Sequence, residues 1–99
     1  MKVIFTREAR GDLRDIGRYL LDQNPRHALT YMEGLRAACF ELAHMPDAFE
    51  VLELSSHPGI RRRVFAPYLI FYRAENSEVR ILRIIHGARD YLRFLNEEI

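Results

Sequence analysis

Residues 9–46, ARGDLRDIGRYLLDQNPRHALTYMEGLRAACFELAHMP, decide the fold of this 99-residue chain. Two apolar series run through the stretch at alternating spacings of three and four, which mark one face of an α-helix. The first series is Ala9, Leu13, Ile16 and Leu20, and the second is Ala28, Met32, Leu35, Cys39 and Leu42. The sequence therefore predicts two amphipathic helices, of which the second extends from about Pro25 to Met45.

Capping and breaking residues set the ends of these helices. Thr6 and Asn24 precede the two helices, at the N-cap position. A side-chain oxygen there can accept a hydrogen bond from a free backbone N–H of the first turn. Pro25 fits the first helical position, where its missing N–H is not needed. Pro46 favours an extended residue before it and so ends the second helix. The short turn between the helices predicts an antiparallel hairpin over about residues 7–45.

The segments on either side of the hairpin have the composition of strands. They are Lys2–Phe5, Val51–Leu54, Ile60–Ala66, Tyr68–Arg73 and Val79–His86. The last is almost wholly apolar, as in a central strand that is covered on both faces. Residues 88–95 predict a short terminal helix or an arm. We therefore expect one α+β domain, a two-layer β-α-α-β-β-β(-α) sandwich, with an antiparallel sheet (its meander at about 60–86) covered by the helical hairpin and followed by a C-terminal arm over 88–99.

Composition narrows the class of protein. A single cysteine, Cys39, excludes an internal disulfide and fits the reducing cytoplasm. The four histidines are not at metal-ligand spacing, so neither a metal nor another cofactor is expected. Apolar runs are far shorter than the roughly 18 residues of a membrane helix, and we expect no signal peptide and no membrane partner. The net charge of +1 gives no indication of sequence-specific DNA binding.

Three blocks of sequence, in a fixed order, carry a family resemblance that covers almost the whole chain. The matching hairpin positions are Ala9, Asp12, Leu13, Ile16, Asn24, Pro25, Ala28, Leu42 and Pro46. The other blocks are GIRRR at 59–63 with YLIFYR at 68–73, and VRILRIIHGARD at 79–90. Together they resemble the ParE branch of the RelE/ParE superfamily of bacterial toxins.

The resemblance implies a toxin that inhibits DNA gyrase and is silenced by a ParD-like antitoxin in a hetero-oligomer. RelE-type relatives of the same fold instead cut messenger RNA on the ribosome, so the fold alone does not settle the function. Three hypotheses stay open. We favour a gyrase inhibitor with no catalysis of its own over a ribosome-dependent endoribonuclease or a degenerate toxin that only binds its antitoxin.

An endoribonuclease would need a base, cations for the phosphate and an acid. Glu53 is the candidate base, Arg61, Arg63 and Arg83 are candidate phosphate ligands, and His86 is the candidate acid. Each has a structural alternative: a solvated loop carboxylate, ion pairs, or a hydrogen bond at a strand end. Arg83 and His86 lie three residues apart, so on a regular strand their side chains face opposite ways.

Two binding surfaces are expected on the toxin. The resemblance and the arginines of the predicted strands give seven target-contact candidates: Arg61, Arg63, Arg83, Arg89, Tyr91, Arg93 and Phe94. Arg61 and Arg63 share a strand face, and Arg83 on a neighbouring strand could join them in a positive patch. A groove beside the first helix is expected to receive an amphipathic helix of the antitoxin, with Arg14, Arg18, Leu20 and Leu21 as contacts. Alternatively, the terminal segment packs on the core through Leu92 and Leu95.

Overall fold

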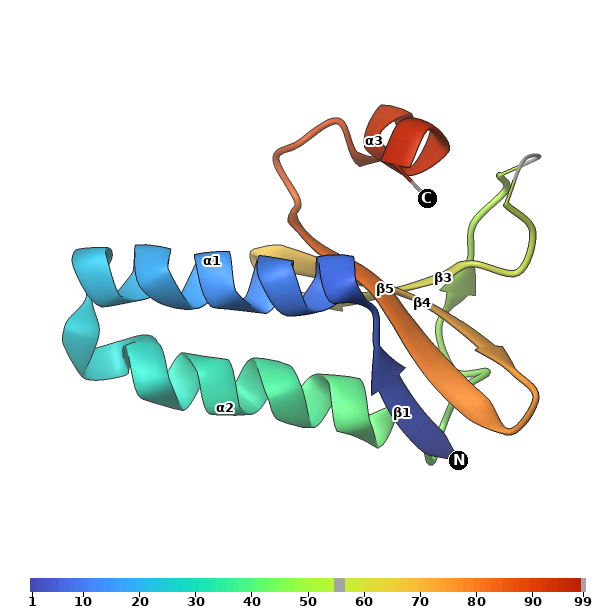
Figure 1. Cartoon of the computed structure of the whole chain (residues 1–99), viewed down its shortest axis with the longest axis horizontal. Coiled ribbons are helices and arrows are strands. Elements are labelled where there is room, and N and C mark those ends of the chain that lie inside the picture. Colours follow the sequence, from blue (N-terminus) through green and yellow to red (C-terminus); the bar gives the residue numbers. More distant parts are fainter. Residues whose placement is uncertain (55–56, 99) are drawn as a thin grey trace.

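The computed structural model describes residues 1–54 and 57–98, apart from the side chains of residues 94 and 96–98. Its elements are β1 (Lys2–Phe5), α1 (Arg7–Gln23), α2 (Pro25–Glu41), β2 (Glu50–Val51), β3 (Arg61–Phe65), β4 (Tyr68–Glu75), β5 (Glu78–His86) and α3 (Tyr91–Glu98). The predicted α+β architecture is confirmed. Figure 1 shows the α1–α2 hairpin projecting beyond the sheet and α3, at the C-terminal end of the chain, lying apart from the hairpin.

The helical hairpin forms where its capping residues place it. Thr6 Oγ1 accepts a hydrogen bond from the Ala9 N–H at 3.1 Å and begins α1. Asn24 ends α1 and begins α2, although its side chain makes no capping hydrogen bond, and Pro25 takes the first helical position. The second helix ends at Glu41, four residues before the predicted end at Met45. Residues 42–44 bond back at a spacing of three, which tightens the last turn before Pro46.

The sheet has the strand order β1-β5-β4-β3-β2. Strands β2 to β5 are antiparallel as expected, but β1 runs parallel to β5, with Lys2 opposite Glu78 and Phe5 opposite Ile81. The sheet is therefore mixed. The reason lies in the connection: the hairpin carries the chain from β1 to the far edge, and the meander returns it so that β5 reaches β1 in the same direction.

The sheet separates two hydrophobic clusters. On the helix face, the side covered by α1 and α2, Leu13, Ile16 and Leu35 pack against strand residues such as Tyr72 and Ile81. On the opposite α3 face, Leu95 packs with Phe71, Leu82 and Ile85. Alternate residues of β4 and β5 therefore enter different clusters, which explains why these strands are apolar on both faces.

Two local differences from the predicted strands have physical causes. The predicted strand Val51–Leu54 is shortened to Glu50–Val51, because Leu52 and Leu54 turn into the α3-face cluster. In β5, Phe71 pairs with Arg83 whereas Tyr72 pairs with Ile81, so Leu82 is an extra residue that forms a bulge. No helix in the described part of the chain is both long and apolar enough to cross a membrane.

Candidate functional site

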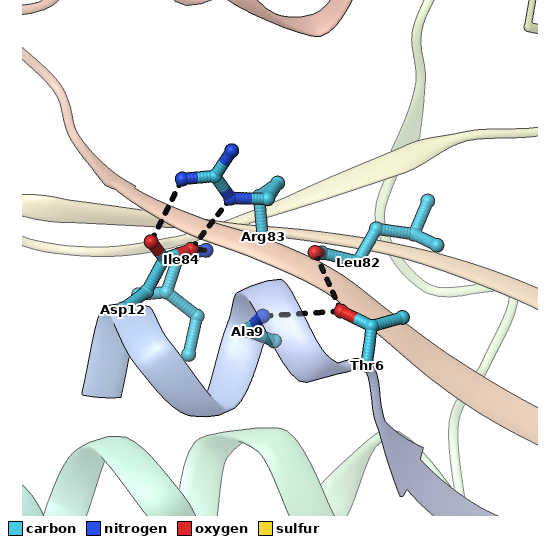
Figure 2. A network of polar contacts seen from close by, with 6 residues as sticks. All are labelled: Thr6, Ala9, Asp12, Leu82, Arg83 and Ile84. Atoms are coloured by element: carbon cyan, nitrogen blue, oxygen red, sulfur yellow. Dashed lines mark hydrogen bonds and ion pairs between the residues drawn. The ribbon is translucent and has the colours of Figure 1, made fainter. Parts of the chain in front are cut away.

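Where β1 ends, backbone groups on the edge of β5 form hydrogen bonds with Thr6, the N-cap of α1, and with Asp12 of α1 (Figure 2). Thr6 Oγ1 donates to the Leu82 carbonyl at 2.9 Å, and Asp12 Oδ2 accepts from the Ile84 N–H at 2.9 Å. Asp12 also receives two hydrogen bonds from Arg83, from Nε at 2.7 Å and from Nη2 at 2.8 Å. Both side chains are at most 14% exposed. Arg83 therefore forms an ion pair, the structural role that the sequence analysis considered as the alternative to binding phosphate.

Arg61 and Arg63 share the helix face, as strand alternation predicts. Arg63 holds the end of α2, and Arg61 holds the segment after it. Arg61 Nη1 donates to the Phe49 carbonyl at 2.7 Å. Arg63 Nη1 donates to the Ala38 carbonyl at 2.8 Å and lies 3.0 Å from Glu41. A cation at the C-terminal end of a helix stabilises its free carbonyl groups. Both arginines thus anchor the end of α2 and the loop beyond it.

Arg83 does not join Arg61 and Arg63 in a patch. It pairs in register with Phe71, which belongs to the α3-face cluster, whereas Arg61 and Arg63 pair with Tyr72 and Ile70 of the helix-face cluster. The three-arginine patch expected from the sequence is therefore not formed. Its members lie on different faces of the sheet.

Arg62, between these two arginines, makes a connection that the sequence analysis did not identify. Its guanidinium donates to Tyr91 Oη at the start of α3 and to Glu50 of β2, and it lies 5.6 Å from the centre of the Tyr91 ring. Arg62 therefore ties α3 to the edge of the sheet. Strand alternation could have predicted the position of Arg62, since it places Arg61 and Arg63 on one face of the sheet and Arg62 on the other.

His86 lies at the end of β5, on the face opposite Arg83. It pairs in register with Tyr68, a member of the helix-face cluster, and their ring centroids are 5.3 Å apart. His86 Nδ1 accepts a hydrogen bond from the Ala88 N–H at 3.1 Å. The imidazole thus supports the turn after β5, which is the structural role considered for it.

Glu53 and His86 lie near opposite ends of β3. Glu53 is exposed and lines a hollow with Leu52, Leu54 and Pro58, just beyond the β2–β3 pairing at Arg61. His86 lies at the other end of β3, beside the Phe65–Tyr68 pair. The described lining of this hollow includes neither Arg63 nor His86.

The buried titratable side chains are not activated nucleophiles. Burial raises the pKa of the Cys39 thiol to about 12, against a smaller lowering by Arg63. Burial, with a smaller contribution from the neighbouring Tyr68, raises the pKa of Tyr31 to about 12. Both groups stay protonated at neutral pH, and the nucleophilic form of a cysteine is the thiolate. Among the described residues, no group of three or more acidic, histidine or cysteine side chains could hold a metal ion.

A groove between α1 and α2 is the main apolar hollow on the hairpin surface. It has a volume of about 300 Å³. Its lining is Leu13, Arg14, Gly17, Arg18, Leu21, Ala28, Leu29, Met32 and Arg36. Three of the four predicted antitoxin-contact candidates lie in it, whereas Leu20 is half-buried against the helix-face cluster. The sequence analysis missed Leu29, Met32 and Arg36, although their spacing of three and four marks one side of α2.

The C-terminal helix presents both an inner and an outer side. Leu95 is fully buried and Tyr91 packs against the same cluster, so α3 is a cover for the sheet. Leu92 is 49% exposed, and Arg89 and Arg93 are also exposed. The target-contact candidate Phe94 has a side chain outside the described part of the structure. The outer side of α3 is therefore accessible to another protein.

Two structural relatives of this chain come from toxin–antitoxin systems. A chain of the chromosomal ParDE system from P. aeruginosa matches with a TM-score of 0.75 and 25% identity, over 87% of this chain and 95% of that chain. A chain of the RelBE2 complex from Mycobacterium tuberculosis matches with a TM-score of 0.64 and 25% identity, over 86% and 95%. No curated protein matches the sequence.

These neighbours and the fold, a helical hairpin on a five-stranded sheet, define the class: a protein of a toxin–antitoxin system. The model of the family "ParE toxin of type II toxin-antitoxin system, parDE" matches residues 3–91. Because this match spans most of the chain, the protein belongs to the ParE toxin family, which confirms the resemblance found in the sequence.

Proposed function

We propose that this toxin inhibits DNA gyrase by binding it, carries no catalytic centre of its own and is neutralised by a ParD-like antitoxin. The observation that supports this proposal is the separation of its candidate catalytic residues. Arg83 and His86 lie on opposite faces of the sheet, and Glu53 and His86 lie at opposite ends of β3. An acid and a base that act on one phosphate must both reach it within hydrogen-bond distance.

The arginines that an endoribonuclease would use are engaged within the protein. Arg63 holds the end of α2, Arg61 holds the loop beyond it, and Arg83 is paired with Asp12. A phosphate would have to compete with these partners. The likeness to the RelBE2 chain keeps a ribosome-dependent endoribonuclease as the second candidate function.

The outer side of α3 is the surface that we assign to the target. Arg93 and Leu92 are exposed on it, and Arg89 is exposed in the turn before the helix, whereas Tyr91 is turned inward towards Arg62. Exposed arginine beside apolar surface is typical of protein interfaces. Substitution of Arg61, Arg63, Arg83 or Tyr91 would act on the target indirectly, by loosening the elements they hold.

Expression of the toxin without an antitoxin, followed by two assays, tests this function. We expect inhibition of gyrase supercoiling and intact messenger RNA in a translating extract. Arg93→Glu should abolish the inhibition, whereas Arg26→Glu, at an exposed arginine of α2, should retain it. Glu53→Ala and His86→Ala should also inhibit supercoiling. Cleaved message that depends on His86 would instead identify an endoribonuclease, and no effect in either assay would identify a degenerate toxin.

A further inference from the structure

The first helix separates its charges into two stripes. Its arginines follow one another at spacings of three, four and four, and its carboxylates at spacings of four, three and seven, so each set keeps to one side of the helix. The two sets are Arg7, Arg10, Arg14 and Arg18, and Glu8, Asp12, Asp15 and Asp22. A helix that is neutral as a whole therefore has a positive side.

The arginines of this positive side do not stabilise the helix through ion pairs. Opposite charges three or four residues apart stabilise a helix when they pair along its surface. All four arginines are exposed, and none forms an ion pair within the described part of the chain. Asp12 is bound by Arg83 of the sheet instead. The guanidinium groups on α1 are therefore available to a ligand outside the protein.

Three of these arginines surround a common hollow. Arg7, Arg10 and Arg14 line it together with Glu8, and its volume is about 620 Å³. Gly11 lies between them in the sequence, and a Cβ atom there would lie 3.6 Å from Arg14 Nη2. The Arg14 guanidinium therefore lies over Gly11, on the side of Arg7 and Arg10. We call this cluster of Arg7, Arg10 and Arg14 the arginine hollow.

We propose that the arginine hollow binds the phosphate backbone of duplex DNA. The inference rests on the proposed function for the source of the duplex, which is the DNA that gyrase holds. Arginine presents a rigid fork of N–H donors that matches a phosphate group. At about 1.5 Å per residue the hollow extends over roughly 10 Å of helix, and a duplex carries one phosphate per 1.7 Å or so of its axis. Each arginine can therefore bind a different phosphate.

The lining of the hollow favours a phosphate backbone over a protein segment. Its described lining residues are all charged, whereas the exposed Leu21 and Leu29 line the groove further along the hairpin. The centre of a protein interface is apolar and poor in charge. Phosphate contacts need cations and carry no information about base sequence. We therefore expect binding that depends on salt but not on sequence.

Fluorescence anisotropy of the full-length toxin with 20-base-pair DNA duplexes of two unrelated sequences tests the proposal. We expect equal affinities for the two duplexes. A plot of log affinity against log salt concentration should have a slope of about −3 for three phosphate contacts, which is roughly a 40-fold loss between 50 and 200 mM salt. Arg10→Gln/Arg14→Gln should reduce the slope to about −1 and weaken binding at least about tenfold at 50 mM salt.

Two further variants separate the hollow from the charge of the whole protein. Arg26→Gln/Arg36→Gln removes two exposed arginines of α2 that do not line the hollow, so the net charge changes equally but the slope should not. Glu8→Gln removes the carboxylate from the described lining and should strengthen duplex binding, because a negative charge repels phosphate. Unchanged circular dichroism and urea midpoints would show that the variants are folded.

An unchanged slope in Arg10→Gln/Arg14→Gln, or an equal reduction in the α2 double variant, would overturn the proposal. So would affinities that differ between the two DNA sequences, or tighter binding of an RNA duplex than of the DNA duplex. The binding assay contains no gyrase. Inhibition of supercoiling by a toxin that does not bind DNA would therefore reject this inference alone, and DNA binding without inhibition would reject the proposed function alone.

Discussion

Asp12 and Arg83 lie 71 residues apart in the sequence and are joined by two hydrogen bonds of 2.7 and 2.8 Å. The same carboxylate also accepts a hydrogen bond of 2.9 Å from the Ile84 N–H. It therefore satisfies a backbone donor on the edge of β5 at the point where β1 has ended. The first helix is fixed to the sheet through this one side chain as well as through its apolar face.

Asp12→Asn tests the contribution of this ion pair to stability. The variant keeps the shape of the side chain but removes the charge and one acceptor, so the largely buried guanidinium of Arg83 loses the carboxylate of Asp12. We expect the free energy of unfolding to fall by about 2–3 kcal/mol, as for a partly buried pair. The urea midpoint measures the change. Asp15→Asn, at an exposed carboxylate of the same helix, should stay within about 0.5 kcal/mol of the wild type; equal losses in both variants would contradict this role.

Tyr91→Phe tests the attachment of α3. The variant retains the ring contact with Phe71, at 5.4 Å between centroids, but removes the hydroxyl that accepts from Arg62. We expect a loss of about 1 kcal/mol, concentrated in α3. Hydrogen exchange should therefore become faster at the amides of α3 while those of α2 remain protected. Leu92→Ala, at an exposed position, serves as the control. Uniformly faster exchange would mean that α3 is not held separately.

The Cys39 thiol should be unreactive in the folded toxin. It is fully buried, and burial raises its pKa to about 12, so almost no thiolate exists at pH 8. We expect a disulfide reagent to label it only as fast as the protein unfolds. The same chain in concentrated urea should react at once. A native rate that approaches the rate in urea would show that the hairpin opens readily above the sheet.

Tyr31 should make the toxin sensitive to alkaline pH. Its hydroxyl donates to the Phe65 and Ala66 carbonyls at 3.1 Å, and burial raises its pKa from 10.0 to about 12. Unfolding therefore releases a proton between these values, so the stability linked to Tyr31 is complete below pH 10 and is lost as the pH rises towards about 12. Urea midpoints across this range should fall, and they should fall less steeply in Tyr31→Phe. Cys39, Tyr68 and Tyr72, whose pKa values burial also raises, contribute to the remaining slope.

Local periodicity was enough to predict the helical hairpin and the strands of the meander. The series from Ala9 to Leu20 and from Met32 to Leu42 point into one cluster, as their spacing requires. The alternation of Arg61, Arg62 and Arg63 was equally readable. Such signals depend only on residues within a few positions of one another, and they hold wherever one face of an element is buried.

Partners distant in sequence could not be predicted in this way. No pattern near Asp12 indicates that it meets Arg83, and the bulge at Leu82 and the parallel pairing of β1 arise only once the sheet closes. The positive patch expected from three arginines failed for the same reason. The sequence gives the positions of the three arginines along their strands. The groups that they bind come from α1, from the end of α2 and from the loop beyond it.

The parallel pairing of the first strand with the last has a consequence during translation. The segment that completes the sheet, Glu78–His86, leaves the ribosome long after residues 7–41, and synthesis proceeds at roughly 5–20 residues per second. For some seconds a nascent chain therefore carries its helices but has no partner for its N-terminal strand. A protein that recognises the hairpin alone can thus bind the nascent toxin before its sheet is complete.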